Sequence, residues 1–567
     1  MNVEQRISKL PLDVQRPDQF IEICGAALDA VQAYYALVRQ KLAAILTPGG
    51  NWNNTLATNY QHEAHGMAWL ATYAGALSAL LDWAKSLHTQ AEFGELEQLI
   101  LTAGFGEYLN QIFGGIPMTQ VEVSRPADFD LQEEAEAIFS VPACVQLRRE
   151  GYSRDVRARL AELIRHGQFG ALQRGDETLD QIADNLRRFV ADRVTPNAHG
   201  WHCRNEYIPM PIIEEMSQLG IFGLTVPEEW GGSGLGKLAM CIASEELSRG
   251  YIGVGSLGTR AEIAAELIRL GGTEAQKQNY LPRIASGELL PTAVFTEPNI
   301  GSDLASLGTR AERVTKPDGT KVFRVTGNKT WITHAARADI MTLLVRTEPD
   351  APGYKGLSML LAEKPRGDDA NPFPAEGMSG GEIEVLGYRG MKEYEIRFDS
   401  FEVPEQALLG GAGGQGFKQL METFESARIQ TAARAVGVAQ NALELGLAYA
   451  LDRTQFAQPI YEFPRVADKL VWMVVETMLA RQISYFAARE KDLGKRCDIE
   501  AGMAKLLAAR TAWSNADNAL QIHGGNGFAL EYPISRVLCD ARILNIFEGA
   551  GEIQAQVIAR GLLTGAN

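Results

Sequence analysis

The carboxylate best placed for chemistry is Glu548, near the carboxy terminus. It lies in residues 542–554, R-I-L-N-I-F-E-G-A-G-E-I-Q, directly after an isoleucine and a phenylalanine. A carboxylate beside apolar surface loses water, which disfavours its charged form, raises its pKa toward neutrality and makes it a useful proton acceptor. The glycines that follow would let the backbone approach a flat ligand. The alternative is a helix-end glutamate that faces solvent, and this segment alone does not decide between the two.

Five further motifs precede this segment in chain order. They are F-G-L-T-V-P-E-E-W-G-G at 222–232, T-E-P-N-I-G-S-D at 296–303, G-N-K-T-W-I-T at 327–333, R-T-Q-F at 453–456 and Q-I-H-G-G-N-G at 521–527. Glycine and serine loops allow close approach of a ligand, and an arginine can pair with a pyrophosphate through its planar fork. Each motif alone has an ordinary explanation, such as a β-turn or a core tryptophan.

Taken together, these motifs resemble the acyl-CoA dehydrogenase family. In that family the glutamate of the last motif removes the α-proton of an acyl-CoA thioester, and the β-hydride passes to N5 of FAD. The resemblance therefore implies that Glu548 is the catalytic base. Some relatives carry the base on another helix, at the position of Ala427 here, and an alanine cannot act.

The resemblance also implies the FAD-binding residues. They are Phe295, Thr296, Gly301, Ser302, Trp331, Ile332, Thr333, Arg453, Gln455, Phe456, Gln521, Gly524, Gly525, Ala550 and Glu552. Amides and the Thr296 hydroxyl would donate to the carbonyl edge of the ring, which becomes negative on reduction. Trp331 would lie along the ring and Thr333 would donate to N5, while Arg453 would reach the FAD of a partner subunit. Ala550 departs from the family's usual threonine.

The acyl-CoA would contact Ser302, Arg260, Glu425, Arg428 and Gly549. An extra helical block in front of the family's usual start resembles members whose substrate is a short, branched acyl-CoA with a free distal carboxylate. A carboxylate in an apolar pocket needs a partner, and Arg260 is the hypothesis. Glycines at 253, 255 and 258 are expected to leave room for the ligand. The alternative for Arg260 is a surface arginine that pairs with Glu262 or Glu266.

The hydrophobic period changes from helical to alternating and back along the chain. We expect helices near 21–46, 58–87, 93–113, 179–194, 211–219, 238–248, 261–270 and 274–286, and strands near 323–327, 331–333, 340–345, 357–361 and 395–398. The fold class is thus mainly α with a central β domain. The family fold of α-bundle, β-barrel-like domain and α-bundle would follow an extra amino-terminal helical domain. The expected domains are 1–170, 171–290, 291–403 and 404–567.

Composition limits the possible partners and compartment. A net charge of −16 argues against nucleic-acid or anionic-membrane surfaces. Six widely spaced cysteines indicate reduced, mostly buried thiols in a cytoplasmic protein. Residues 1–11 lack an apolar signal core, and we expect no apolar run long enough to span a bilayer.

Several patterns are decoys. The two G-x-G-x-x-G matches, at 253–258 and 411–416, lack the strand–turn–helix context of a nicotinamide site. His62 with His65, and His199 and His202 with Cys203, offer too few ligands for a metal. We therefore expect no metal site.

The family resemblance implies electron-transfer flavoprotein as electron acceptor and a homo-oligomer, a dimer rather than a tetramer. Three alternatives remain open at this point. They are a dehydrogenase for another short acyl-CoA of the isobutyryl or glutaryl kind, a flavin oxidase of the same fold, and a non-catalytic scaffold protein.

Overall fold

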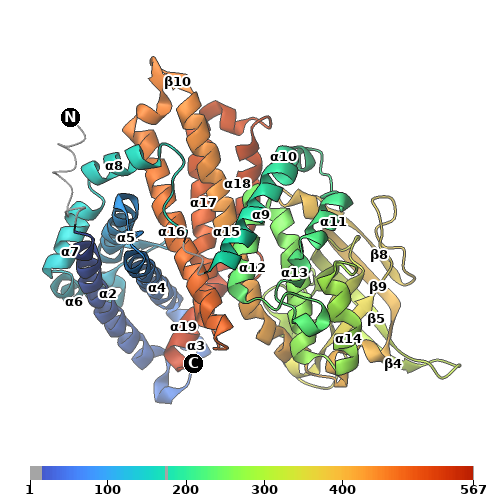
Figure 1. Cartoon of the computed structure of the whole chain (residues 1–567). Coiled ribbons are helices and arrows are strands. Elements are labelled where there is room, and N and C mark those ends of the chain that lie inside the picture. Colours follow the sequence, from blue (N-terminus) through green and yellow to red (C-terminus); the bar gives the residue numbers. More distant parts are fainter. Residues whose placement is uncertain (1–15, 173–175, 566–567) are drawn as a thin grey trace. The chain divides into compact units, whose positions relative to one another are not determined.

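A computed structural model describes residues 16–172 and 176–565 (Figure 1). The chain forms two compact units, one of residues 1–177 with 431–567 and one of residues 178–430. The boundary between residues 430 and 431 falls inside helix α15 (Gly416–Asp452). The four domain spans expected from the sequence remain a prediction, because these units group the chain differently. The segment 1–11, for which no signal core was expected, lies outside the described residues.

The first unit begins with amino-terminal helices, of which the sequence predicted those over 21–46, 58–87 and 93–113. They are α2 (Pro17–Leu46), α3 (Asn54–Asn59), α4 (Gln61–Thr89), α5 (Glu95–Gly114), α6 (Gln132–Ile138), α7 (Pro142–Gln146) and α8 (Arg154–Ile164), with a short ribbon of β1 (Ile116–Pro117) and β2 (Val123–Ser124). The helix expected over 58–87 is broken at Tyr60 into α3 and α4. The helix α2 ends where Thr47 and Pro48 stop the pattern, as predicted.

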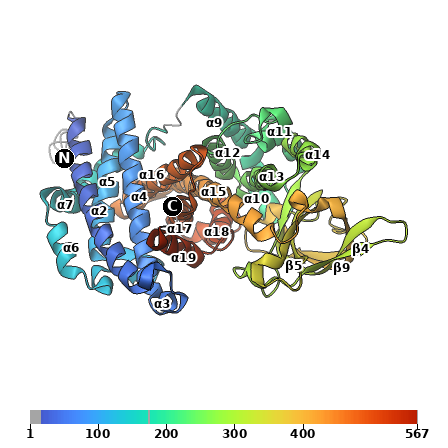
Figure 2. The same ribbon diagram turned by 90° about the horizontal axis from the view of Figure 1, so that it is seen from below.

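The same unit contains the carboxy-terminal helices α16 (Pro464–Asp492), α17 (Asp498–His523), α18 (Pro533–Ile543) and α19 (Gly551–Thr564), and the ribbon β10 (Thr454–Gln455) with β11 (Gln458–Pro459). Helix α4 packs against α16, α17 and α19 as well as against α2 and α5 (Figure 2). A buried hydrogen bond joins the two groups, because Tyr108 of α5 donates at 3.2 Å to Glu476 of α16, which also pairs with Arg510 of α17 at 2.9 Å. The amino-terminal helices therefore share a core with the carboxy-terminal ones.

Helix α2 contradicts one expectation from the sequence. Among the described residues it is long and apolar enough, by length and composition, to cross a membrane, and 33% of its most apolar window is buried. Core helices of soluble proteins meet the same criteria, so a single such helix is weak evidence for a membrane span. Its buried face packs against α4 and α5.

The second unit starts with helices α9 (Glu177–Phe189), α10 (Thr195–Cys203), α11 (Met210–Gln218), α12 (Lys237–Gly250), α13 (Ile252–Gly271) and α14 (Glu274–Ala285). The glycine motif at 253–258 lies inside α13 and is not a loop. A Cβ on Gly255 would collide with Ser248 of α12, and one on Gly258 would press on Met240 and Ile221. These glycines let helices pack closely, so the expectation that they leave room for a ligand is wrong.

A sheet of seven strands follows. The strands are β3 (Pro291–Val294), β4 (Arg310–Thr315), β5 (Lys321–Thr333), β6 (Ile340–Arg346), β7 (Leu357–Glu363), β8 (Met378–Ile383) and β9 (Glu393–Pro404). Their order is β3-β6-β4-β5-β9-β8, with β7 paired to β6. The long antiparallel pair β5–β9 contains a bulge between Lys329 and Ile332. The mainly helical protein with a central sheet was predicted correctly, whereas the strands β3, β4 and β8 were missed.

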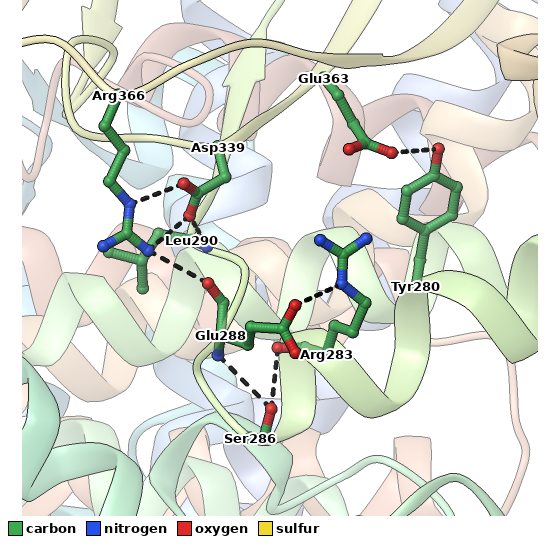
Figure 3. A network of polar contacts seen from close by, with 8 residues as sticks. All are labelled: Tyr280, Arg283, Ser286, Glu288, Leu290, Asp339, Glu363 and Arg366. Carbon is green, nitrogen blue, oxygen red and sulfur yellow. Dashed lines mark hydrogen bonds and ion pairs between the residues drawn. The ribbon is translucent and has the colours of Figure 1, made fainter.

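A polar network fixes the entry to this sheet (Figure 3). Arg366 binds Asp339 through two hydrogen bonds of 2.6 and 2.7 Å, and Asp339 accepts from the Leu290 amide at 2.7 Å. The Arg366 guanidinium also donates to the Glu288 carbonyl at 3.1 Å. Paired charged hydrogen bonds of this kind give directional specificity as well as energy. The network therefore holds the start of β3 against the start of β6, just before the T-E-P loop.

Candidate active site

Glu548 lies in a tight turn between α18 and α19 of the first unit. Its backbone is left-handed, with φ of +52°, and that of Gly549 is also left-handed at +91°. Glycine accepts this region freely, but a residue with a Cβ adopts it only when its surroundings enforce it. The enforcing contacts are Lys505, which donates to the Gly549 carbonyl at 2.6 Å, and Gln554, which donates to the Glu548 carbonyl at 3.2 Å. The turn is thus held from both α17 and α19.

The Glu548 side chain is only 13% exposed, so it is not the solvent-facing glutamate of the alternative interpretation. Its Oε1 accepts from Arg434 Nη2 at 2.8 Å, and its Oε2 accepts from the Thr431 hydroxyl. Arg434 Nη2 also donates to Thr431 Oγ1 at 2.8 Å, which closes a triangle on α15. The sequence predicted an apolar, dry environment, but the structure adds a cation that favours the charged carboxylate.

Arg434 itself is fully buried, with its guanidinium 4.9 Å from the centre of the Phe547 ring. A buried charge is tolerated when it is paired and hydrogen-bonded, and this one is. Sequence reasoning missed Arg434 because it lies six residues beyond the recognised Arg428, in the interior of a long helix. Its signal would have been a charged residue on the buried face of α15, among alanines and valines.

In the second unit, the T-E-P loop is tied to strand β5 by a buried ion pair. Glu297 accepts from Lys329 Nζ at 3.2 Å and from the amides of Gly308 and Thr309 at 2.9 and 2.7 Å. Lys329, which has no exposed side chain, also donates to the Phe295 carbonyl at 2.9 Å. Burial lowers the pKa of Lys329 to about 8, against the opposing charge of Glu297. The pair explains the acid of one motif and the lysine of the next, which sequence reasoning left without a role.

The β-bulge in β5 aims the W-I-T motif. Trp331 has a left-handed backbone with φ of +57° and is 55% exposed, while Ile332 is buried beneath it. Bulges of this kind re-aim side chains and are frequent next to functional sites. The result is a large exposed aromatic face on a rigid strand, as the role proposed for Trp331 requires.

The Thr333 hydroxyl is less available as a hydrogen-bond donor to a flavin than expected. Its hydroxyl donates to Glu393 on the paired strand β9, at 2.9 Å from Oε1 and 3.1 Å from Oε2. A hydroxyl has one proton, so in this geometry Thr333 offers a flavin only its acceptor lone pair. Sequence reasoning expected it to be a donor and did not identify Glu393.

Glu393 is a buried acid with an altered proton affinity. Burial raises its pKa to about 7, although the Thr333 hydrogen bond and the charge of Arg260 act in the opposite direction. The neighbouring His334 is held neutral, since burial and surrounding cations that include Arg337 lower its pKa to about 3. His334 and Lys392 both have left-handed backbones at this end of the β5–β9 pair.

The remaining FAD-binding candidates fall into two groups, one in each unit. Phe295 and Thr296 are half-buried next to Lys329, and Gly301 and Ser302 are exposed. In the first unit Arg453, Gln455, Phe456, Gln521, Gly524, Gly525 and Glu552 are exposed, and Ala550 is half-buried. A Cβ on Gly301, Gly524 or Gly525 would meet no heavy atom within 4 Å. Open glycine backbone and an exposed tryptophan face fit a flat dinucleotide.

Arg260 was expected either to bind the substrate or to pair with Glu262 or Glu266. Glu262 and Glu266 both pair with Lys237, and Glu262 also accepts from Gln430. Arg260 is half-buried on α13, and its charge acts on Glu393. Of the other candidates, Glu425 is buried, Arg428 lies 5.8 Å from the Phe424 ring, and Ser302 and Gly549 are at least partly exposed.

No group of three or more metal-binding side chains occurs among the described residues. His199 contacts Cys203 at 3.6 Å, without a further ligand set around them. All six cysteines lie within the described chain and are free thiols, four of them buried.

Comparisons with known proteins agree with this geometry. Family models for the acyl-CoA dehydrogenase N-terminal, middle and C-terminal domains match residues 176–288, 292–401 and 414–563. A (2S)-methylsuccinyl-CoA dehydrogenase of Cereibacter sphaeroides is 60% identical over 96% of this chain and 98% of its own length.

Two solved structures are similar to about two thirds of the chain. Butyryl-CoA dehydrogenase of Megasphaera elsdenii is 30% identical with a TM-score of 0.63, over 68% of this chain and 98% of its own. A chain described with the electron-transferring flavoprotein of Acidaminococcus fermentans is 32% identical with a TM-score of 0.64, over the same shares. The three matching family models and the 60% identical relative from Cereibacter sphaeroides show that the chain belongs to the acyl-CoA dehydrogenase family, whose members use FAD.

Proposed function

We propose that this enzyme oxidises (2S)-methylsuccinyl-CoA to mesaconyl-CoA, a step of the ethylmalonyl-CoA pathway. The observation that carries the proposal is the extent of the match to the relative named for this substrate. That match runs through the amino-terminal helices, which pack into the core of the first unit. The two solved relatives cover 68% of the chain.

Glu548 removes the α-proton of the thioester. It is mostly buried, held by a turn with an enforced backbone, and paired with Arg434, whose charge favours the carboxylate form that accepts a proton. The backbone amide of this same residue polarises the thioester carbonyl, which acidifies the α-carbon. Lys505 and Gln554 keep the turn in place during the proton transfer.

In the second unit, Trp331 and the amides and hydroxyl of Phe295 and Thr296 would hold the isoalloxazine ring of an FAD. In the first unit, the open backbone at Gly524 and Gly525 would contact the adenine end of an FAD. When bound, it supplies the acceptor for the β-hydride. Lys329 and Glu297 keep the T-E-P loop and β5 in register, and Glu393 sets the direction of the Thr333 hydroxyl.

Electron-transfer flavoprotein is the proposed electron acceptor, and the cytoplasm the proposed compartment. We also propose a homodimer, supported by the hairpin that follows Arg453. Phe456 at its tip is 88% exposed on a left-handed backbone, and Phe528 and Leu530 are similarly exposed in the same unit. Exposed apolar groups of this kind mark protein–protein contacts.

The test is Glu548→Gln in the purified, FAD-containing enzyme. Gln keeps the size and one acceptor oxygen but cannot take the proton, so turnover of methylsuccinyl-CoA should fall at least ~10²-fold while the flavin spectrum is retained. Wild-type turnover in this variant would refute the role. Anaerobic bleaching by a panel of acyl-CoA thioesters, followed by oxygen or a one-electron acceptor, separates the other substrates, an oxidase and a colourless scaffold.

A further inference from the structure

A surface pocket of the second unit has no part in the proposed function. Its volume is about 570 Å³, which is within the range of small-molecule sites, and no residue of the recognised motifs lines it. The loop after α10, the segment after β5, the loop after β7 and the start of β9 form its walls. Charged side chains of both signs line the pocket, so their pairing decides which ligand it can take.

All but one of the cations that line this pocket already have a carboxylate partner. Arg204 binds Glu206 through hydrogen bonds of 2.8 and 2.7 Å. Lys392 donates to Asp369 at 2.9 Å. Arg337 is the exception, because no carboxylate lies within ion-pair distance of it in the described part of the chain.

Arg337 is held with one edge of its guanidinium unused. The side chain is half-buried, its Nη1 donates to the Ile208 carbonyl at 2.8 Å, and its Cζ lies 3.9 Å from the centre of the Tyr207 ring. Its Nε and Nη2 atoms make no hydrogen bond with any residue that the structure describes. These two N–H groups form the edge that binds both oxygens of a carboxylate, and the contact with Tyr207 fixes the direction of that edge.

A half-buried cation is stable only if other groups offset the loss of its hydration. The Tyr207 ring and one carbonyl do this in part. Burial still lowers the pKa of Arg337, although the charge of Asp369 acts in the opposite direction. An anion against the unused edge would complete the offset, so the pocket is suited to a negatively charged ligand.

The other charges of the pocket limit how negative that ligand can be. Asp369 and Glu206 line the same pocket, with side chains 69% and 47% exposed. Glu382 shares Lys392 with Asp369, so this group contains one more carboxylate than cations. A second negative charge on the ligand would meet repulsion from these carboxylates, which favours a single carboxylate over a phosphate dianion.

We propose that this pocket binds a small organic monocarboxylate through the unused edge of Arg337. The bound ligand would bridge the two segments that hold the Thr333–Glu393 pair, because Arg337 follows Thr333 by four residues and Lys392 directly precedes Glu393. Binding should therefore stiffen this end of the β5–β9 pair from outside the active site. The site does not depend on which acyl-CoA the enzyme oxidises, so its failure and that of the proposed function are separate outcomes.

The experiment is ligand-observed NMR of propionate with the purified, FAD-containing enzyme, with phosphate and methylammonium as competitors. We expect propionate to bind with a dissociation constant of about 1–10 mM, as for a ligand of few atoms held mainly by one charged contact. Phosphate should bind at least ~3-fold more weakly than propionate, and methylammonium should not displace it. Absence of propionate binding at 50 mM protein-excess conditions of about that scale, or phosphate binding tighter than propionate, would overturn the assignment.

Substitution of two arginines locates the carboxylate. Arg337→Met removes the unused edge and should weaken propionate binding at least ~10-fold. Arg204→Met is the matched control, because that guanidinium is already bound to Glu206 in an exposed pair, and should change the dissociation constant less than ~3-fold. Equal weakening in both variants, or binding that survives in Arg337→Met, would place the carboxylate at another cation.

Two further readouts apply if Arg337→Met does not fold. Arg337→Lys keeps the charge but loses the paired donors, and should weaken propionate binding ~3–10-fold, whereas a constant equal to wild type contradicts the assignment. In the wild-type enzyme, saturating propionate should slow hydrogen exchange in peptides that contain Tyr207 and Lys392. Slower exchange only in other regions would show that propionate binds elsewhere.

Discussion

Glu393→Gln should remove a pH dependence from the stability of the second unit. Burial raises the pKa of Glu393 from 4.5 to about 7, so the folded state binds a proton that the unfolded state releases between these values. Stability from such a group is fully present below pH ~4.5 and is lost as the pH rises through ~7. The difference of about 2.5 units corresponds to about 3 kcal/mol at 1.36 kcal/mol per unit.

The measurement is urea unfolding at pH 5 and pH 8, read by hydrogen exchange in peptides that cover β5 and β9. The wild-type protein should lose most of that 3 kcal/mol in this region between the two pH values, and Glu393→Gln should lose much less. Glutamine is the matched neutral group, since its carbonyl can still accept from Thr333. Equal pH dependence in both proteins would show that Glu393 is ionised in the fold and would refute the reasoning.

Two further substitutions test the cofactor scaffold and the oligomer. Lys329→Met leaves the buried Glu297 without its cation and should destabilise the second unit by about 3–5 kcal/mol, which would be measured as a lower Tm and loss of FAD. Adding Glu297→Gln removes the unpaired charge and should restore part of the lost Tm. A double variant with no higher Tm than Lys329→Met would contradict the ion-pair explanation. Phe456→Ser should raise the dissociation constant of the oligomer at least ~10-fold without lowering Tm. Light scattering at micromolar protein concentration measures this constant, and an unchanged value would place the interface elsewhere.

The sequence predicted those features that depend on local pattern. The helical and alternating periods gave the fold class, and the motif around Glu548 identified the proposed base. The partners of these residues could not be read from the sequence, because they lie far away along the chain. Arg434 is 114 residues from Glu548, and Glu393 is 60 residues from Thr333. Only the folded backbone brings such pairs together.

The glycines in α13 show a second limit of prediction from the sequence. Their spacing looks like a ligand loop, yet at Gly255 the absent side chain makes room for Ser248 of a neighbouring helix. Absence of a Cβ permits close approach of anything, whether a cofactor or protein. The spacing of glycines therefore predicts a close approach to the backbone but does not identify the group that approaches.

The shared core of α4 with α16, α17 and α19 makes the front of this chain an obligate part rather than a detachable module. Truncation before residue 176 would expose the apolar faces of three carboxy-terminal helices and deprive Glu476 of its Tyr108 contact. We therefore expect that trimming this protein to the dehydrogenase domains does not give a stable enzyme. Once these helices had been acquired, their loss in evolution would have exposed apolar surface on the carboxy-terminal helices and lowered solubility.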